Sequence, residues 1–311
     1  MKNIAVIGIG GIGGYFGGKL TRLLGRDSRV NIYFIARGRQ LEAIQSGGLV
    51  LDAEEGRMTC VPTKAMERIA DLPQLDYCLI CVKGYDLANV LRQLKDKISD
   101  STVILPLLNG VDIFERVRAV VKNGYLHPAC VYISTFVEKP GVVIQRGPSS
   151  TILLGPDPGR NQEDRSILAL LEAAGIKHGW KEEPFVEIWN KYLFIAPFGL
   201  VTADTGKTIG EALRSEVDLS TVKSIMGEIV ALANAKGIGL SAGIVEETLA
   251  KAATFPAETR TSFQRDVSVA EKPDERDLFA GSIIRMGKDF AIPTPVTEAV
   301  FASIERKKPG R

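Results

Sequence analysis

The sequence of 311 residues contains little that could bind a metal ion or cross a membrane. It has four cysteines and only two histidines, His127 and His178, and no zinc-ligand spacing connects them. No apolar run approaches the roughly 18–20 residues needed to span a bilayer. The short apolar run at residues 4–9 is followed by glycines rather than by a cleavage site. We therefore expect no metal site, no membrane association and a cytoplasmic protein.

The chain also has no excess of charge of either sign. Its 39 basic and 37 acidic residues give a formal net charge of +2, so no basic surface for nucleic acid is evident. With 45% hydrophobic and 24% charged residues, the composition is typical of a globular protein of one large or two ordinary domains. We expect a small-molecule ligand and no nucleic acid. The sequence leaves the oligomeric state undecided: a homodimer is possible, but no heptad stripe marks an interface.

Two of the cysteines, Cys78 and Cys81, have the C-x-x-C spacing that occurs in redox and metal sites. They lie within residues 77–82, a continuous apolar segment with the character of a strand. No second pair and no histidine cluster completes a ligand set. We therefore expect buried strand side chains, which is the ordinary role of a reduced cysteine.

What the sequence does contain is a glycine-rich turn between an apolar strand and an amphipathic helix. Residues 2–7 form the strand pattern, Gly-Ile-Gly-Gly-Ile-Gly follows at 8–13, and a helical pattern runs to residue 24. In a dinucleotide site the first glycine permits the tight turn, the second lets a pyrophosphate approach, and the third lets the helix pack closely. The helix N-terminus then presents N–H groups to the phosphates. The candidate cofactor-binding residues of the turn are Gly8, Ile9, Gly10, Gly11, Ile12 and Gly13. The alternative is a glycine turn without a ligand.

The pattern of apolar residues changes once along the chain. Over residues 1–181, short apolar runs alternate with helical patterns, as in a mostly parallel sheet covered by helices. Strands are predicted at 30–36, 75–82, 102–108 and 176–180, antiparallel strands within 129–154, and helices at 86–94 and 166–174. From residue 182 onward, helical spacing dominates, with helices predicted at 185–203, 217–236, 243–254 and 277–286. We therefore expect an α/β fold, with a Rossmann-type dinucleotide-binding domain at 1–181 and an all-helical domain at 182–311.

The end of the second predicted strand bears on the choice of cofactor. An NAD site usually places an acid there for the ribose 2′-hydroxyl, whereas an NADP site offers arginine instead. In this sequence Arg37 follows the strand and no acid is present. Because a guanidinium can pair with a 2′-phosphate in fork geometry, we predict NADPH/NADP+ as the cofactor. The alternative is a solvated arginine at the start of a helix.

The order and spacing of its motifs make the chain resemble the ketopantoate reductase (2-dehydropantoate 2-reductase) family over nearly its whole length. The matching segments are the glycine turn, Arg37, Val82-Lys83, Asn109-Gly110, Trp189-Asn190-Lys191, and Glu275-Arg276-Asp277 before Gly281. This resemblance implies NADPH-dependent reduction of a 2-oxo acid, namely ketopantoate to pantoate in pantothenate biosynthesis.

The resemblance also implies roles for individual residues. Lys83 lies near the cofactor, and Asn109 contacts both the nicotinamide region and the substrate. Lys191 is the expected catalytic acid, since a lysine in an apolar helix with a lowered pKa can protonate a developing alkoxide. Glu275 would hydrogen-bond and orient the substrate, and Ser262 would bind its carboxylate.

Each of these residues also has a simpler interpretation. The alternatives are a surface lysine at 83, an Asn-Gly turn at 109, a snorkelling lysine at 191, a solvated helix start at 275 and a helix-cap or loop serine at 262. The match around Glu275 is uncertain by one residue, so Asp274 could occupy its place.

The chain departs from the family one and two helical turns after Lys191. The family usually places asparagines there, whereas this sequence has Ile195 and Gly199 on the same helix face. Backbone groups freed by Pro197, or the hydroxyl of Thr202, could replace the missing polar contacts. Alternatively, the substrate is a less polar 2-oxo acid, as in a related 2-hydroxy acid dehydrogenase. A third, non-enzymatic interpretation is an NADPH-binding sensor.

Overall fold

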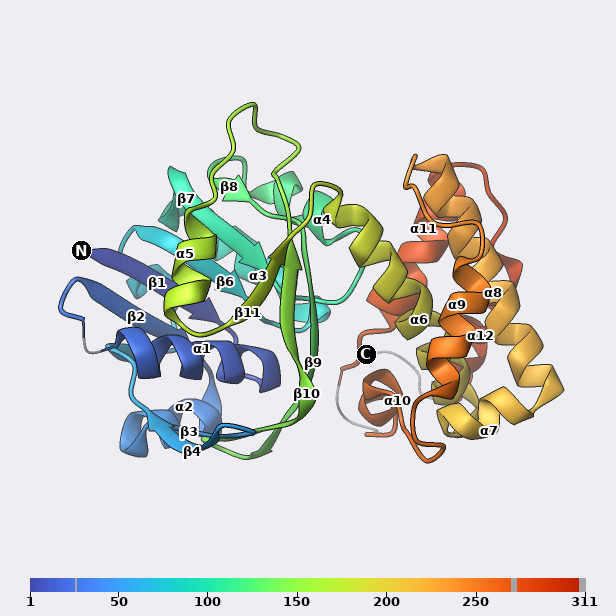
Figure 1. Ribbon diagram of the computed structural model, residues 1–311, viewed down its shortest axis with the longest axis horizontal. Helices are drawn as coiled ribbons and strands as arrows, with labels where there is room; N and C mark the ends of the chain where they lie inside the picture. The colour runs from blue at the N-terminus through green and yellow to red at the C-terminus, as the bar shows by residue number, and fades with distance from the viewer. Residues whose placement is uncertain (26, 270–272, 308–311) are drawn as a thin grey trace. The chain divides into compact units, whose positions relative to one another are not determined.

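The computed structural model describes residues 1–25, 27–269 and 273–307, and the chain divides into two units (Figure 1). The N-terminal unit comprises Met1–Leu108 and Ile113–Pro184, and the helical unit comprises Asn109–Asp112 and Phe185–Arg311. The N-terminal unit is built on a parallel sheet, and the other unit contains helices. The fold class predicted from the sequence is therefore confirmed.

Six parallel strands form the first sheet of the N-terminal unit, in the order β5-β2-β1-β6-β7-β8. They are β1 (Lys2–Ile7), β2 (Val30–Ile35), β5 (Lys64–Met66), β6 (Leu75–Ile80), β7 (Ile98–Pro106) and β8 (Tyr125–Leu126). Strand β1 lies between β2 and β6, so the strand order reverses beside it. Sheets of this kind bind ligands outside the carboxyl ends of their strands at such a reversal, and this is where the glycine turn lies.

A second sheet has the order β11-β10-β3-β4, with β9 also paired to β10. Its strands are β3 (Leu49–Ala53), β4 (Gly56–Cys60), β9 (Ala129–Lys139), β10 (Val142–Leu154) and β11 (Lys177–Trp180). The antiparallel pairing of β9 with β10 confirms the prediction for residues 129–154. The β3–β4 hairpin was not predicted, because its outer strand is largely exposed and lacks an apolar run.

Helix α1 (Gly11–Leu24) packs against strands of both sheets, and its residues 13–21 are all buried. A Cβ atom at Gly17 would lie 2.9 Å from the Phe34 ring on β2, and one at Gly14 would lie 2.5 Å from Val143 on β10. These glycines therefore let the two sheets approach the helix from both sides. In this unit the remaining helices are α2 (Gly38–Gly47), α3 (Gly84–Leu94), α4 (Ile113–Val120) and α5 (Ser166–Ala173), and the short 3₁₀ turns are η1 (Ile69–Asp71) and η2 (Lys95–Lys97).

Of the two cysteines with C-x-x-C spacing, Cys78 lies within β6 and Cys81 directly follows it, so the expected strand position is confirmed for Cys78 and wrong for Cys81. Cys78 is fully buried, and burial raises the pKa of its thiol far above the usual value, so it stays a neutral apolar side chain. Cys81 follows the strand and is half-buried. Across the described residues, no group of three His, Cys, Asp or Glu side chains is arranged to hold a metal ion.

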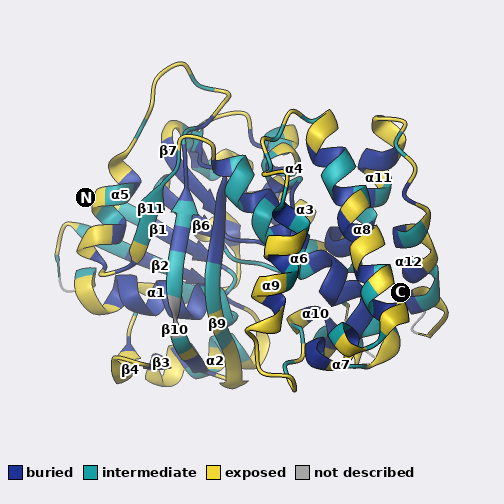
Figure 2. Cartoon of the chain, turned by 45° about the vertical axis from the view of Figure 1, so that its right-hand side comes forward, coloured by how far each residue is buried: buried dark blue, intermediate teal, exposed yellow. Residues whose placement is uncertain are grey.

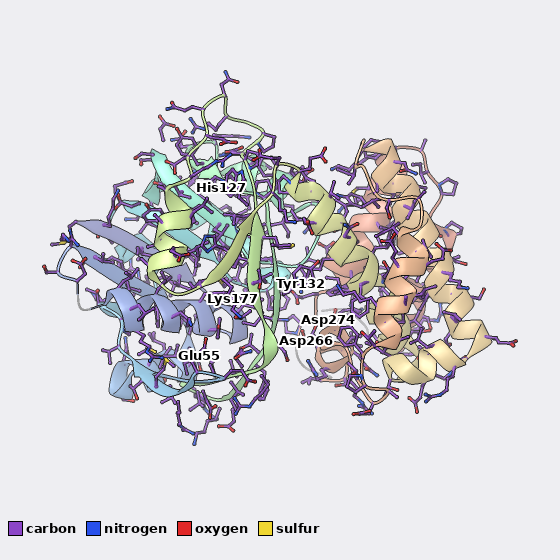
Figure 3. The ribbon with its side chains drawn as sticks, viewed as in Figure 1. Glu55, His127, Tyr132, Lys177, Asp266 and Asp274 are labelled. Atoms are coloured by element: carbon purple, nitrogen blue, oxygen red, sulfur yellow. The ribbon has the colours of Figure 1, made fainter. Side chains whose placement is uncertain are left out.

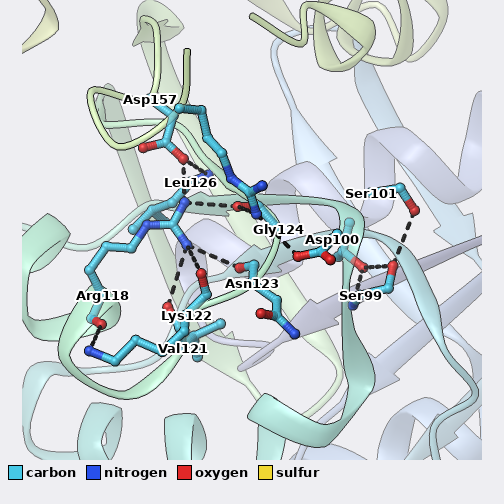
Figure 4. A network of polar contacts seen from close by, with 12 residues as sticks. Ser99, Asp100, Ser101, Arg118, Val121, Lys122, Asn123, Gly124, Leu126 and Asp157 are labelled. Carbon is cyan, nitrogen blue, oxygen red and sulfur yellow. Dashed lines mark hydrogen bonds and ion pairs between the residues drawn. The ribbon is translucent and has the colours of Figure 1, made fainter. Parts of the chain in front are cut away.

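An arginine–aspartate network holds the chain around β8 at the edge of the first sheet (Figure 4). Arg118 on α4 forms an ion pair with Asp157 and donates hydrogen bonds to the carbonyls of Asn123 at 3.0 Å and Gly124 at 2.8 Å. Asp157 also accepts from the Leu126 backbone N–H at 2.8 Å. Because the Asp157 side chain is only 2% exposed, its pairing with the guanidinium is needed to keep a buried charge tolerable.

His127 lies next to this network and is 1% exposed (Figure 3). Its Nδ1 atom lies 2.8 Å from the Gly155 carbonyl oxygen. Burial lowers the pKa of His127 below its usual value of 6.5, so the unfolded chain takes up this proton more readily than the folded protein does. Stability is therefore expected to fall as the pH drops through about 6.5, since proton binding then favours the unfolded state.

Thermal unfolding midpoints measured between about pH 7 and pH 5 would test this expectation. His127→Gln should flatten the decline in that range, because the buried titrating group is gone. The matched variant His178→Gln leaves His127 in place and should keep the decline. An unaltered pH profile in His127→Gln would contradict the assignment.

The helical unit confirms the main helical predictions. Its elements are α6 (Pro184–Thr205), α7 (Ile209–Arg214), α8 (Glu216–Ala235), α9 (Ile244–Ala253), α10 (Ser262–Val267), the π-helix η3 (Asp277–Gly281), α11 (Ser282–Asp289) and α12 (Pro295–Lys307). The helix predicted at 277–286 consists of η3 followed by the first part of α11. Figure 2 shows buried and exposed residues alternating along α8, as its amphipathic pattern requires. No helix among the described residues has the length and apolarity to span a bilayer.

Candidate cofactor and catalytic sites

The glycine turn after β1 is open on one side and closely packed on the other. Gly8 has a φ of +93°, which favours glycine. A Cβ atom at Gly13 would lie only 2.0 Å from the Gly8 carbonyl oxygen, whereas one at Gly10 would meet nothing within 4 Å. The backbone at Gly10 is therefore accessible to a ligand, as a pyrophosphate requires.

A cavity of about 300 Å³ lies over this turn, and all of its lining belongs to the N-terminal unit. Five residues predicted from the sequence to bind the cofactor line it: Gly8, Ile9, Gly10, Arg37 and Lys83. The structure thus brings the turn and the residues after β2 and β6 together at the carboxyl ends of three neighbouring strands.

The other three residues of the motif face protein instead of the cavity. The Gly11 carbonyl oxygen accepts a hydrogen bond from Thr135 Oγ1 on β9 at 3.2 Å, and Ile12 packs against the hydrophobic core. Gly13 packs on the backbone of Gly8. In the structure, these residues position helix α1 rather than line the cavity.

The cavity also contains two acids that the sequence did not point to. Arg37 Nη2 lies 2.6 Å from Asp86 Oδ2 in the first turn of α3, and Glu67, which follows β5, lines the same cavity. No acid follows β2 in the sequence, but the parallel sheet brings Asp86, from the helix after β6, to Arg37. Only the strand order could have revealed them.

Lys191 and Asn109 meet in the helical unit although 82 positions separate them in the chain. Lys191 lies on α6 and its Nζ donates a hydrogen bond to Asn109 Oδ1 at 2.7 Å. The neighbouring Trp189 is fully buried, whereas Lys191 is half-buried. The ammonium group is thus held in place by a side chain that can both donate and accept hydrogen bonds.

Tyr192, the next residue, ties α6 to the segment that carries Glu275. Its hydroxyl lies 2.6 Å from the Leu278 carbonyl oxygen and 3.0 Å from that of Phe279, both in the π-helix η3. Glu275 lies two residues before this π-helix and is 7% exposed. Single π-helical turns are frequent at functional sites, and this one fixes the backbone that follows Glu275.

The neighbouring Asp274 has a different structural role (Figure 3). Its carboxylate accepts hydrogen bonds from Arg276 Nε at 2.9 Å and Nη2 at 2.8 Å, and its side chain is 2% exposed. This hydrogen-bonded ion pair raises the pKa of Arg276. The Asp274 carboxylate is therefore paired with the guanidinium of a residue two positions further along the chain.

Ser262 is the exposed first residue of α10, and it is not the cap of that helix. The cap is Thr261, whose Oγ1 accepts a hydrogen bond from the Gln264 backbone N–H at 3.1 Å. The helix-cap interpretation of Ser262 is therefore wrong.

The helix face after Lys191 is closed by aromatic side chains. Gly199 is buried, and a Cβ atom there would lie 3.2 Å from the Phe279 ring, which stacks on Phe263 with centroids 4.7 Å apart. Thr202 is also buried, and its hydroxyl donates to the Phe198 carbonyl oxygen at 2.6 Å. Helix α6 continues through Pro197 as one element.

Two family models match this chain. The model described as ketopantoate reductase PanE/ApbA matches residues 4–159, and that described as ketopantoate reductase PanE/ApbA C terminal matches residues 186–308. The chain belongs to the ketopantoate reductase PanE/ApbA family.

Known relatives match it over almost the full length. The uncharacterized oxidoreductase YkpB of Bacillus subtilis (strain 168) is 28% identical, with 96% of this chain and 97% of the relative covered. The 2-dehydropantoate 2-reductase of Mesorhizobium japonicum is 27% identical, with 97% of each covered. The crystal structure of a PanE/ApbA family ketopantoate reductase from Ralstonia eutropha JMP134 has a TM-score of 0.87, 25% identity and 98% of each chain covered. The family is one of oxidoreductases.

Proposed function

We propose that this protein is an NADPH-dependent 2-oxo acid reductase, and that ketopantoate is the substrate it reduces to pantoate. The observation that carries this proposal is the 2.7 Å hydrogen bond from Lys191 Nζ to Asn109 Oδ1. It places a half-buried ammonium beside an amide that can donate and accept hydrogen bonds. Such a pair can bind a carbonyl oxygen and protonate it. Membership of the ketopantoate reductase family supports the choice of substrate.

The residues of the N-terminal unit fit a nicotinamide dinucleotide. The open backbone at Gly10 would accommodate the pyrophosphate together with Gly8 and Ile9, and Arg37 would bind the 2′-phosphate. Lys83, which precedes α3 and lines the same cavity, would lie on the cofactor side of the sheet. When bound, NADPH supplies the hydride that the reduction needs.

The side chains of the helical unit would manage the oxygen and the carboxylate of the substrate. Lys191 would stabilise the negative charge that develops on the carbonyl oxygen and transfer a proton from Nζ to it. Asn109 would hold the ammonium in position. Glu275 would orient the substrate, and Ser262 would bind its carboxylate.

Purified protein is therefore expected to oxidise NADPH when ketopantoate is added, which the loss of NADPH absorbance measures. NADPH binding without turnover of any 2-oxo acid would instead favour a cofactor-binding sensor. It would remove the proposed enzymatic function.

A second candidate substrate is a less polar 2-oxo acid, such as 2-oxoisovalerate or phenylpyruvate. It is favoured by Ile195 and by Gly199, where an added Cβ atom would lie 3.2 Å from the Phe279 ring, in tight contact with it. Ketopantoate carries a hydroxyl group that these acids lack, and an apolar face would leave it without a partner.

Ile195→Asn is expected to shift specificity toward ketopantoate. A new amide beside a substrate hydroxyl should raise the ratio of kcat/KM for ketopantoate to that for 2-oxoisovalerate by about 3–10-fold, the effect of one hydrogen bond. The conservative variant Ile195→Val should leave the ratio unchanged. An equal ratio in Ile195→Asn and the parent protein would show that position 195 does not face the substrate side chain.

A further inference from the structure

The cofactor cavity contains an ion pair between residues that follow two different strands. Arg37 follows β2 at the N-cap position of α2, while Asp86 lies in the first turn of α3 after β6. Arg37 Nη2 donates to Asp86 Oδ2 at 2.6 Å, and both side chains line the cavity over the glycine turn. The arginine expected to select the cofactor therefore has a carboxylate bound to it.

This pair contributes little to the stability of the fold. The Arg37 side chain is 63% exposed and that of Asp86 is 24% exposed, and exposed ion pairs are worth little in stability. Removing either charge should therefore leave the protein folded. Removing either charge should, however, change the affinity for a charged ligand in the same cavity, because the ligand would lie close to both charges.

The two charges act in opposite directions on a 2′-phosphate. The guanidinium of Arg37 attracts it, while the carboxylate of Asp86 repels it and also occupies one of the N–H donors that could bind it. An unphosphorylated ribose has hydroxyl groups there, and a carboxylate accepts hydrogen bonds from such hydroxyls in NAD sites. Glu67 lines the same cavity and adds a further negative charge to it.

We propose that Asp86 determines how strongly this protein discriminates between NADPH and NADH, by opposing the attraction of Arg37 for the 2′-phosphate. The protein would consequently bind NADH as well as NADPH. This inference rests on the proposed function only in that the cavity binds a nicotinamide dinucleotide. It is independent of the substrate.

The test is the binding of each cofactor to the full-length protein without substrate, measured by calorimetry at low salt. Asp86→Asn should lower the Kd for NADPH by about 3–10-fold, the effect of one like charge at the surface. The Kd for NADH should stay the same or rise. The gain in NADPH affinity should shrink at high salt, because screening weakens the interaction between exposed charges.

Three variants make the result specific. Asp96→Asn removes the same charge from an exposed residue outside the cavity and should leave both Kd values unchanged. Asp86→Ser keeps a small polar side chain at the start of α3 and should reproduce the effect of Asp86→Asn. Arg37→Met should weaken NADPH binding by at least about tenfold and NADH binding much less.

An equal change in both Kd values in Asp86→Asn, or a change matched by Asp96→Asn, would overturn the role of Asp86. Parent protein that binds neither cofactor would overturn both this inference and the proposed function. Binding that follows the predicted pattern without turnover of any 2-oxo acid would remove only the proposed reaction.

Discussion

Lys191→Ala is expected to lower kcat for ketopantoate reduction by about 10²–10⁴-fold, the range for loss of a general acid. The variant removes the ammonium that Asn109 holds at 2.7 Å and leaves the developing alkoxide without a positive charge or a proton. NADPH binding should be unchanged, since the glycine turn and its cavity belong to the N-terminal unit. Steady-state kinetics together with calorimetric titration of NADPH would separate the two effects.

Two comparisons distinguish a catalytic lysine from a structural one. Lys223→Ala removes an exposed lysine from α8 of the same unit and should retain full activity. The double variant Lys191→Ala with Asn109→Ala should lose little more than Lys191→Ala alone, because residues that act as a unit have non-additive effects. Robust turnover by Lys191→Ala would show that a group other than Lys191 donates the proton to the substrate oxygen.

Gly13→Ala is expected to cause the largest loss of stability among the glycine-turn variants. The new methyl group would overlap the Gly8 carbonyl oxygen at 2.0 Å and touch Cys81 Cβ at 3.0 Å, and backbone cannot move aside as a flexible side chain can. Forced overpacking of this kind costs about 1–3 kcal/mol. A lower thermal unfolding midpoint, together with weakened NADPH binding, would be the result.

Gly10→Ala is the matched control at the neighbouring position of the motif. Its methyl group would meet no protein atom within 4 Å, and the residue has a φ of −92°, which alanine adopts readily. Its thermal midpoint should therefore stay close to that of the parent, while NADPH binding weakens because the methyl group stands where the pyrophosphate approaches. Equal loss of stability in both variants would contradict the separation of packing from ligand contact.

Local sequence patterns were sufficient to predict much of the fold. The glycine turn between a strand and a helix predicts β1, α1 and the cofactor side of the sheet, because that spacing has few other uses. Helical periodicity predicts α6, α8 and α9 to within two residues of their ends. Helices α7 and α10 have only six residues each, too few for a periodic pattern to stand out. Helix α12 begins at Pro295, two residues after Pro293, and closely spaced prolines are more typical of a loop.

The parts of the site that were missed depend on tertiary pairing. Asp86 reaches Arg37 only because β2 and β6 flank β1, and the sequence does not state the order of strands. Similarly, the sequence does not reveal that Asp274 forms an ion pair with Arg276. The glycines of α1 illustrate a third limit. Only the structure shows that Gly14 and Gly17 serve the packing of two sheets.

Because of the loop at Asn109–Asp112, the N-terminal and C-terminal halves of the chain cannot be exchanged independently between related proteins. It follows a strand of the parallel sheet in sequence, yet it groups with the helical unit, where Asn109 contacts Lys191 and Asp112 lies 3.5 Å from Arg285. A chimera joined near residue 184 would inherit Lys191 from one parent and its amide partner from another. Chimeras of family members should therefore be active more often when this short loop and the C-terminal half come from the same parent.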